Sequence, residues 1–224
     1  MKLTYHGHSV LSIVMKDGQK LLFDPFITGN SLTDLTAEDV ETDWILVTHG
    51  HSDHIGDMLA IAQANKATII AIAEVATYAQ SQGVKAHGMS QGGRYVFPFG
   101  SVKFVPALHS SGYEIDGVMT YMGEASGIIL EAEDKKIYHA GDTALFSDMR
   151  LFAKDKSIDV AFLPIGDNYT MGPEDALEAV SYLNPKITIP IHYNTFPVIQ
   201  QNPAIFAEQV VGGKVLNPGE TILV

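Results

Sequence analysis

The sequence contains no cysteine among its 224 residues, which excludes both disulfides and thiolate metal ligands. It also lacks any Lys/Arg-rich run and has a formal net charge of −12, so general binding to nucleic acid backbones is not expected. No uncharged apolar run approaches the length of a membrane span, and the first residues lack the apolar centre of a signal peptide. These absences predict a cytoplasmic protein that binds neither nucleic acid nor membrane.

The remaining composition, 46% hydrophobic and 18% charged, is ordinary for a globular protein. A chain of 224 residues is long enough to bury a substantial core, and no linker, repeat or low-complexity run divides it. We therefore expect a single domain over residues 1–224.

Strand and helix patterns alternate along the chain. Residues 2–24 have strand character with a hairpin turn at Asp17-Gly18. Over the whole chain, a group of strands is followed by alternating strands and helices, and this order occurs twice. Further strands are expected at Trp44–Val47, Ala67–Ala71, Arg94–Phe97, Val102–Leu108, Gly127–Ala132, Lys136–His139, Ile158–Leu163, Ile187–Ile191 and Thr221–Val224. Helices are expected at Ile55–Asn65, Glu74–Gln82 and Leu145–Ala153, and after Gly172-Pro173 and Asn202-Pro203. This order favours a two-sheet α/β core with helices outside.

Histidine and aspartate side chains gather at the ends of the predicted strands. Four potential metal ligands fall within six residues directly after an apolar strand, and three more each follow a later strand. Because strand ends on one rim of a sheet converge, side chains distant in sequence can meet there. The seven candidate ligands are His49, His51, Asp53, His54, His109, Asp142 and His192.

Imidazole and carboxylate ligands suit Zn²⁺, Mn²⁺ and Fe²⁺. Seven ligands exceed what one tetrahedral ion needs and are about right for two ions that share a carboxylate and a water. Taken singly, His109, His192 and Asp142 read as ordinary loop, strand-end and turn residues, so the prediction depends on the set.

The ligand pattern resembles that of the metallo-β-lactamase superfamily. The resemblance covers nearly the whole chain and rests on His49-x-His51-x-Asp53-His54, His109, Gly141-Asp142 and His192. Other motifs resemble a compact bacterial subgroup of uncharacterised metal-dependent hydrolases, related to the ascorbate-6-phosphate lactonase branch. These motifs are Tyr5-His6-Gly7-His8-Ser9, Asp24-Pro25, Leu163-Pro164-Ile165-Gly166 and Met171-Gly172-Pro173. The resemblance implies a four-layer αββα sandwich.

The resemblance also implies a ligand set and a reaction. One metal would be held by His49, His51 and His109, and the second by Asp53, His54 and His192, with Asp142 bridging. Zn²⁺ is the first expectation, with Mn²⁺ or Fe²⁺ as alternatives. A metal-bridging hydroxide would then attack a small ester, lactone or phosphoester. The chain is too short for the insertions of nuclease branches, and it lacks the thiol ligand of some true β-lactamases, so both activities are disfavoured.

Several residues near these motifs have more than one interpretation. Asp53 is expected to ligate and also to orient the nucleophile or pass on a proton, and His8 is either a substrate-contacting catalytic group or a hydrogen-bonded strand-end residue. Asp24 either holds a ligand imidazole or forms a turn. The segments 167–172 and 194–196 are expected to shape the pocket, with Tyr169 as a candidate acid or oxyanion donor. His139 is expected to be structural, and no role is assigned to His6 or His87.

Two other functions remain open at this point: a di-iron redox protein, and a non-catalytic metal-binding regulatory protein of the same fold. The complete ligand set argues against the second, and the low carboxylate content and the absence of a flavin domain argue against the first. A small-molecule substrate is the expected partner, and pairing of subunits through an apolar face of an outer helix layer is left open.

Overall fold

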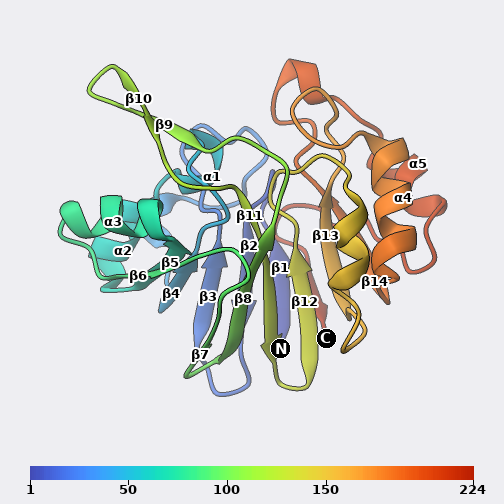
Figure 1. Cartoon of the computed structure of the whole chain (residues 1–224), viewed down its shortest axis with the longest axis horizontal. Helices are drawn as coiled ribbons and strands as arrows, with labels where there is room; N and C mark the ends of the chain where they lie inside the picture. Colours follow the sequence, from blue (N-terminus) through green and yellow to red (C-terminus); the bar gives the residue numbers. More distant parts are fainter.

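Two facing β-sheets form the centre of the computed structural model, which describes residues 1–224 (Figure 1). The strands of the first sheet are β1 (Lys2–Tyr5), β2 (Leu11–Val14), β3 (Lys20–Phe23), β4 (Trp44–Leu46), β5 (Thr68–Ile72), β6 (Ala86–Met89) and β15 (Thr221–Leu223). Those of the second are β7 (Arg94–Phe97), β8 (Gly100–Pro106), β11 (Ser126–Ala132), β12 (Lys135–His139), β13 (Val160–Pro164) and β14 (Ile187–Ile191). The spatial orders are β15-β1-β2-β3-β4-β5-β6 and β14-β13-β12-β11-β8-β7.

The strand directions bring several carboxyl ends to one rim. In the first sheet β3, β4, β5 and β6 are parallel, and β1 runs the same way because it is antiparallel to β2, which is antiparallel to β3. In the second sheet β12, β13 and β14 are parallel, and β8 runs with them because both β8 and β12 are antiparallel to β11. The loops after β1, β3, β4, β8, β12 and β14 therefore share one side of the molecule (Figure 1).

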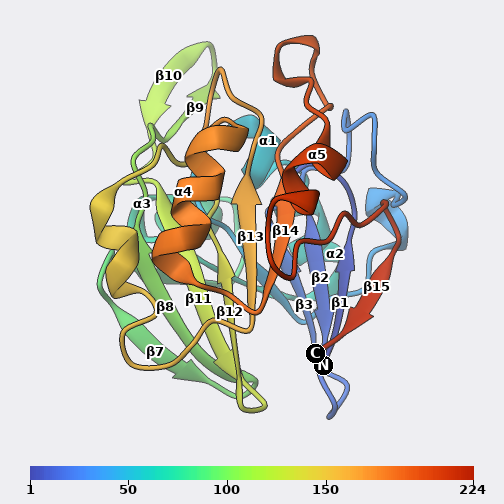
Figure 2. The ribbon, with the colours of Figure 1, turned by 90° about the vertical axis from the view of Figure 1, so that its right-hand side faces the viewer.

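Helices cover the outer faces of both sheets. On one flank lie α2 (Met58–Asn65) and α3 (Ala73–Ser81), and on the other α4 (Pro173–Leu183) and α5 (Pro203–Glu208) (Figure 1). Figure 2 shows α4 and α5 in front of the strands. The larger of two hydrophobic clusters joins the inner sheet faces to α2 and α3, and the smaller joins the second sheet to α4 and α5. This is the predicted αββα sandwich. None of its helices has both the length and the apolar character needed to cross a bilayer.

Most predicted elements are confirmed within two residues of their bounds, including the hairpin turn at Asp17-Gly18 between β2 and β3. The prediction of one helix over Ile55–Asn65 was wrong. Two helices, α1 (Ser52–Ile55) and α2, are separated at Gly56, whose φ is +31°. A Cβ there would lie 2.5 Å from the Pro25 carbonyl oxygen, so the chain must turn at this glycine to pass the neighbouring loop.

The segment Leu145–Ala153, predicted as a helix, contains only the 3₁₀ turn η2 (Ser147–Leu151). Two shorter 3₁₀ turns are η1 (Ala37–Asp39) and η3 (Pro197–Ile199). Three strands were not predicted: β6, and the hairpin of β9 (Gly112–Ile115) and β10 (Val118–Tyr121), which projects from the body (Figure 1). The hairpin has a readable signal, because Asp116-Gly117 at its tip adopts positive φ at both residues.

Candidate metal centre

The rim brings all seven predicted ligands together. His49 and His51 lie in the loop after β4, and Asp53 and His54 lie in the first turn of α1, so the cluster is part loop and part helix. The other three follow β8, β12 and β14. Their ligand atoms form two groups, each within 4.8 Å: His49, His51, His109 and Asp142 in one, and His8, Asp53, His54 and His192 in the other. The histidines and Asp53 fall into the groups in which they were predicted, Asp142 falls in the first group, and His8 joins the second.

In the first group three imidazole nitrogens converge. Nδ1 of His51 lies 3.0 Å from Nε2 of His49 and 3.2 Å from Nε2 of His109. Oδ2 of Asp142 completes the group, 3.5 Å from Nε2 of His109 and 3.9 Å from Nε2 of His49. Three ring nitrogens and one carboxylate oxygen form a donor set that suits a Zn²⁺-like cation.

Asp142 also contacts the second group. Its Oδ1 lies 3.2 Å from Nε2 of His54, and its Oδ2 lies 3.0 Å from Nε2 of His192. Oδ2 of Asp53 approaches the same His192 nitrogen at 3.6 Å. Asp142 is therefore the one carboxylate between the two groups, at the position from which it was predicted to bridge two ions.

Unsatisfied buried atoms test whether a cation fits. Oδ1 of Asp142, Nε2 of His54 and both ring nitrogens of His192 are buried and have no hydrogen-bond partner, because the short contacts between them lack hydrogen-bond alignment. Buried polar atoms without partners are costly and uncommon. A cation coordinated by the two Nε2 atoms and the carboxylate would satisfy three of these four atoms, so the residues present fit a metal.

A second layer of hydrogen bonds fixes which nitrogen faces the cluster. Oδ2 of Asp24 accepts from Nδ1 of His54 at 2.8 Å and from the Thr48 hydroxyl at 2.7 Å. Because that hydroxyl donates to Asp24, its oxygen accepts from Nδ1 of His49 at 3.0 Å. Both imidazoles therefore carry their proton on Nδ1 and present a free Nε2. Of the two interpretations of Asp24, the structure shows the contact with a ligand imidazole.

The electrostatic environment favours the ligand forms of His49 and Asp142 but the protonated forms of His54 and His192. Burial lowers the pKa of His49 well below its usual value, which keeps the ring neutral. Burial opposes ionisation of Asp142, but His192 and His54 outweigh it and hold the Asp142 pKa well below its usual range. Burial is likewise outweighed at His192, where Asp142 raises the pKa to about 9. At His54 burial is outweighed in the same way by Asp142 and Asp24, which hold the His54 pKa well above its usual value. A cation entering the second group must therefore displace a proton from both rings.

His8 lies behind the cluster and does not line the cavity. Its side chain is fully buried, and burial together with His192 lowers its pKa to about 4. Nε2 contacts Oδ2 of Asp53 at 3.1 Å, and Nδ1 contacts the Thr195 hydroxyl at 2.9 Å. Since the carboxylate only accepts, the neutral ring donates from Nε2 to Asp53 and accepts from Thr195. The structure thus places His8 where it holds Asp53, and catalysis by His8 itself stays a prediction.

Five of the seven ligands, all except His49 and His54, line a cavity of about 490 Å³. The residues lining it are Phe26, His51, Ser52, Asp53, His109, Ser110, Asp142, Tyr169, His192 and Phe196. The expectation that segments 167–172 and 194–196 shape the pocket agrees with the positions of Tyr169 and Phe196. Phe26 and Ser110 were missed, although each follows directly on residues already singled out, Asp24-Pro25 and His109.

The three remaining histidines with expectations lie outside the cluster. His139 donates from Nε2 to the Ser9 carbonyl at 2.9 Å and accepts from the Gly141 amide at 3.1 Å, which is the predicted structural role. His6 hydrogen-bonds Asp34 and Ser12, and His87 packs against aromatic rings on the outer edge of the sheets. Neither reaches the cavity.

This fold and this cluster define a class of protein, the hydrolases built on a metallo-β-lactamase-type sandwich. The model of the β-lactamase superfamily domain matches residues 19–193, and the chain belongs to that superfamily. His8 and Thr195 both lie outside the matched range.

Closer relatives narrow the class. A "UPF0173 metal-dependent hydrolase" of Enterococcus faecalis is 87% identical over 224 residues and is covered completely, as is this chain. One of Anoxybacillus flavithermus is 56% identical, with 99% of each chain covered. A solved structure, the metallo hydrolase Igni18 of the archaeon Ignicoccus hospitalis, is 37% identical with a TM-score of 0.89, covering 99% of this chain and 97% of that one. The protein is therefore a metal-dependent hydrolase. The relation to the ascorbate-6-phosphate lactonase branch stays a prediction, since none of these relatives bears on it.

Proposed function

We propose that the protein is a dinuclear metal-dependent hydrolase that cleaves a small ester, lactone or phosphoester. The observation that supports this most is Asp142, one carboxylate in contact with histidines of two separate ligand groups at the floor of an accessible cavity. Two divalent cations bound there would lower the pKa of a shared water and supply hydroxide near neutral pH. Zn²⁺ is the first candidate, followed by Mn²⁺ and Fe²⁺.

The chain's own residues then have distinct tasks. His49, His51 and His109 would hold the first cation, His54, His192 and Asp53 would hold the second, and Asp142 would be shared between them. Asp24 and Thr48 keep Nε2 of His49 and His54 turned inward.

Asp53 has a second task beside ligation. It lines the cavity, and its Oδ2 accepts a hydrogen bond from His8. Its other oxygen, Oδ1, has no hydrogen-bond partner in the protein. We assign to Asp53 the orientation of the attacking group and the transfer of its proton to the leaving group.

Metal analysis followed by a substrate panel tests the proposal. The protein should bind two ions per chain, and the metal-loaded form should hydrolyse members of a panel of lactones, thioesters and bis-p-nitrophenyl phosphate. His51→Ala and His192→Ala should abolish the same activity, because each removes a ligand of a different group. Iron with a visible absorption band and no hydrolysis would instead favour the redox alternative. Two bound ions with neither activity would favour the regulatory one.

A further inference from the structure

We propose that the substrate is an uncharged carboxylic ester or lactone whose flat or apolar group packs against Phe26 and Phe196, and that phosphoesters are poor substrates. This inference rests on the proposed hydrolase function and narrows it to one substrate class. It depends on two independent features of the cavity: an aromatic wall, and the absence of any cationic side chain.

One wall of the cavity is aromatic. The rings of Phe26 and Phe196 lie 6.2 Å apart at 34°, and the buried ring of His8 supports both from behind in edge contacts at 5.3 and 5.5 Å. Tyr169, a residue that is 55% exposed, adds a third ring. Half-buried and exposed aromatic rings that line a cavity beside polar groups are typical of sites that bind an apolar group and direct a polar one.

Hydrogen bonds brace the loop that carries Phe26. The Asp57 carboxylate accepts from the amides of Ile27 and Thr28 at 3.0 and 2.7 Å. The Asn30 side chain donates to the Phe26 carbonyl at 3.0 Å. Gly56 permits this close approach, since a larger residue would clash with Pro25. The ring is therefore held in place before a ligand arrives, which lowers the entropic cost of binding.

The Phe196 loop is closed in the same way. The Ile199 amide donates to the Phe196 carbonyl at 3.2 Å, and the Asn194 amide donates to the Ile199 carbonyl at 2.8 Å. The Asn194 side chain accepts from the Gln201 amide at 2.8 Å. Two separately braced phenylalanines on one wall form a built surface for an apolar group.

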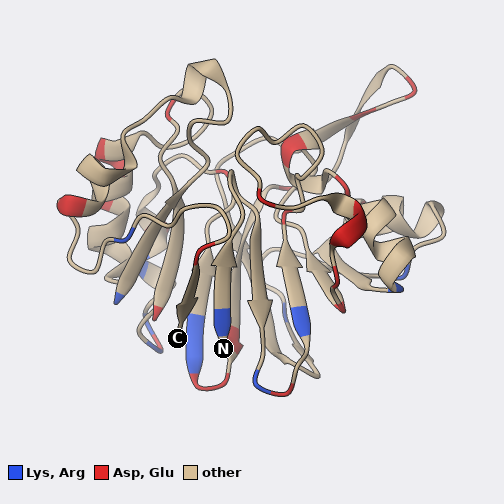
Figure 3. Cartoon of the chain, turned by 180° about the vertical axis from the view of Figure 1, so that it is seen from behind, with Lys and Arg blue, Asp and Glu red and all other residues tan.

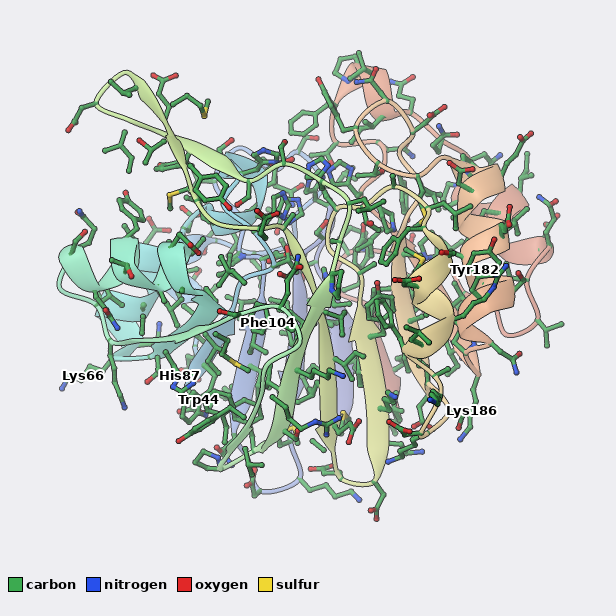
Figure 4. All side chains as sticks on the ribbon, in the orientation of Figure 1. Trp44, Lys66, His87, Phe104, Tyr182 and Lys186 are labelled. Atoms are coloured by element: carbon green, nitrogen blue, oxygen red, sulfur yellow. The ribbon has the colours of Figure 1, made fainter.

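The cavity has no Lys or Arg in its lining. A second hollow of about 570 Å³, also lined by His51 and His109, likewise has no Lys or Arg in its lining, and it includes Glu124. Lys and Arg lie mainly toward the opposite end of the strands, and none appears on the loops of the rim (Figure 3). Lys66 and Lys186 illustrate this, since both lie on the outer flanks of the lower half (Figure 4).

Phosphate groups in proteins are usually held by Arg or Lys side chains, because several donors or a full positive charge are needed to replace their hydration. Here the bound cations would be the only positive charges near the reacting group, and a peripheral phosphate or carboxylate would have no partner. The formal net charge of −12 further opposes the approach of anions. A neutral carbonyl substrate incurs neither penalty.

A pair of matched esters tests the charge requirement. p-Nitrophenyl hexanoate and mono-p-nitrophenyl adipate share a leaving group and an acyl length, and differ by one terminal carboxylate. With the metal-loaded enzyme, kcat/KM should be at least about tenfold higher for the hexanoate. Tyr169→Lys, which places a cation at an exposed lining position, should shift that ratio toward the adipate. An adipate preferred by the native protein, or bis-p-nitrophenyl phosphate as the best substrate of the panel, would overturn the inference.

Truncation of the aromatic wall tests the packing requirement. Phe26→Ala and Phe196→Ala should each raise KM for the hexanoate roughly tenfold, since apolar contact with the acyl or aryl group is lost. Metal content should stay close to that of the native protein, whereas the melting temperature should fall somewhat because both rings are half-buried. Tyr95→Ala removes an exposed ring on the distant strand β7 and serves as the matched control, with unchanged KM. An unchanged KM in both phenylalanine variants would refute the wall's role.

Binding of an inert analogue separates this inference from the proposed function. The ketone in which CH₂ replaces the ester oxygen of p-nitrophenyl hexanoate cannot be hydrolysed, and its affinity is measurable by calorimetry. Ketone binding that both phenylalanine variants weaken supports the substrate class even if no ester is cleaved, in which case the hydrolase proposal alone fails. Absence of ketone binding, or tighter binding of inorganic phosphate than of the ketone, counts against the substrate class even where hydrolysis is observed.

Discussion

The two ends of the β-strands use carboxylates in opposite ways. At the end away from the cavity, Asp159 accepts from the Lys186 ammonium at 2.8 Å and from the Lys136 amide at 2.9 Å. Glu133 pairs there with the amino terminus at 3.0 Å. At the cavity end, Asp142 is just as buried but contacts only histidines, and one of its oxygens has no hydrogen bond.

The difference separates carboxylates that stabilise the fold from those that serve a site. A carboxylate whose charge is balanced by Lys or by backbone amides contributes to stability. One that is buried among imidazoles keeps coordination positions open for a cation. Buried polar atoms without partners, rather than buried polar atoms as such, therefore mark the functional end.

The sharpest way to break the comparison is to remove the shared carboxylate. Asp142→Asn should lose at least one metal per chain and lower kcat/KM by about a thousandfold, because charge stabilisation at the reacting centre is lost. Elemental analysis and steady-state kinetics measure both effects. Two retained ions per chain would show that Asp142 does not bridge.

A smaller loss of metal binding is expected when Asp24, which hydrogen-bonds the ligand His54, is replaced. In Asp24→Asn the side chain can no longer accept as an anion from both His54 and Thr48, so His54 loses its fixed orientation. Metal affinity should fall about 10- to 100-fold, in the range found for such outer partners. Competition with a chromophoric chelator measures it, and Ser12→Ala, which removes a hydroxyl bound to His6 outside the cluster, is the control.

Metal removal should show how much the bound ions contribute to the stability of the folded protein. At a free metal concentration about 100 times Kd, binding of each ion adds about 2.7 kcal/mol. Chelation of both ions should therefore lower the melting temperature by about 10–20 °C for a chain of this size. Calorimetry of the metal-loaded and chelated forms measures the shift, and equal melting temperatures would contradict a structural contribution of the metals.

At the opposite end the effect should fall on stability alone. Burial opposes ionisation of Asp159, but Lys186 and the Lys136 amide outweigh it and lower the pKa of this carboxyl. A lowered pKa in the folded state means that the stabilisation is present at neutral pH and is lost as pH falls below about 4. Asp159→Asn should cost about 1.5 kcal/mol at pH 7. Chemical denaturation of the native protein and the variant at pH 7 and below pH 4 measures this difference in unfolding free energy. Metal content and activity should not change.

The smallest effect is expected at Tyr169. Its hydroxyl makes no hydrogen bond within the protein, and its half-exposed ring lines the cavity. Tyr169→Phe keeps the ring, so kcat should stay within about twofold of the native value. A larger fall in kcat would instead identify the hydroxyl as the acid or oxyanion donor considered from the sequence.

The strand and helix pattern predicted a two-sheet core with helices outside, and the family resemblance implied the four-layer sandwich. The meeting of the seven ligands could be expected because strand ends converge by topology, whatever the loops between them do. The sequence could not predict the break at Gly56, which results from contact with the Pro25 loop, far earlier in the chain. The position of His8 behind Asp53 was equally unreadable, since it depends on Thr195 at the far end of the chain. The aromatic wall joins Phe26 and Phe196, and no local pattern connects them.

The place of His192 late in the chain has a consequence for biosynthesis. Ribosomes deliver His49 to His54 before His109 and Asp142, which complete the first group, and long before His192, which completes the second. Until His192 is made, the nascent chain offers no complete second group. We expect the second ion to bind only after nearly the whole chain has been released.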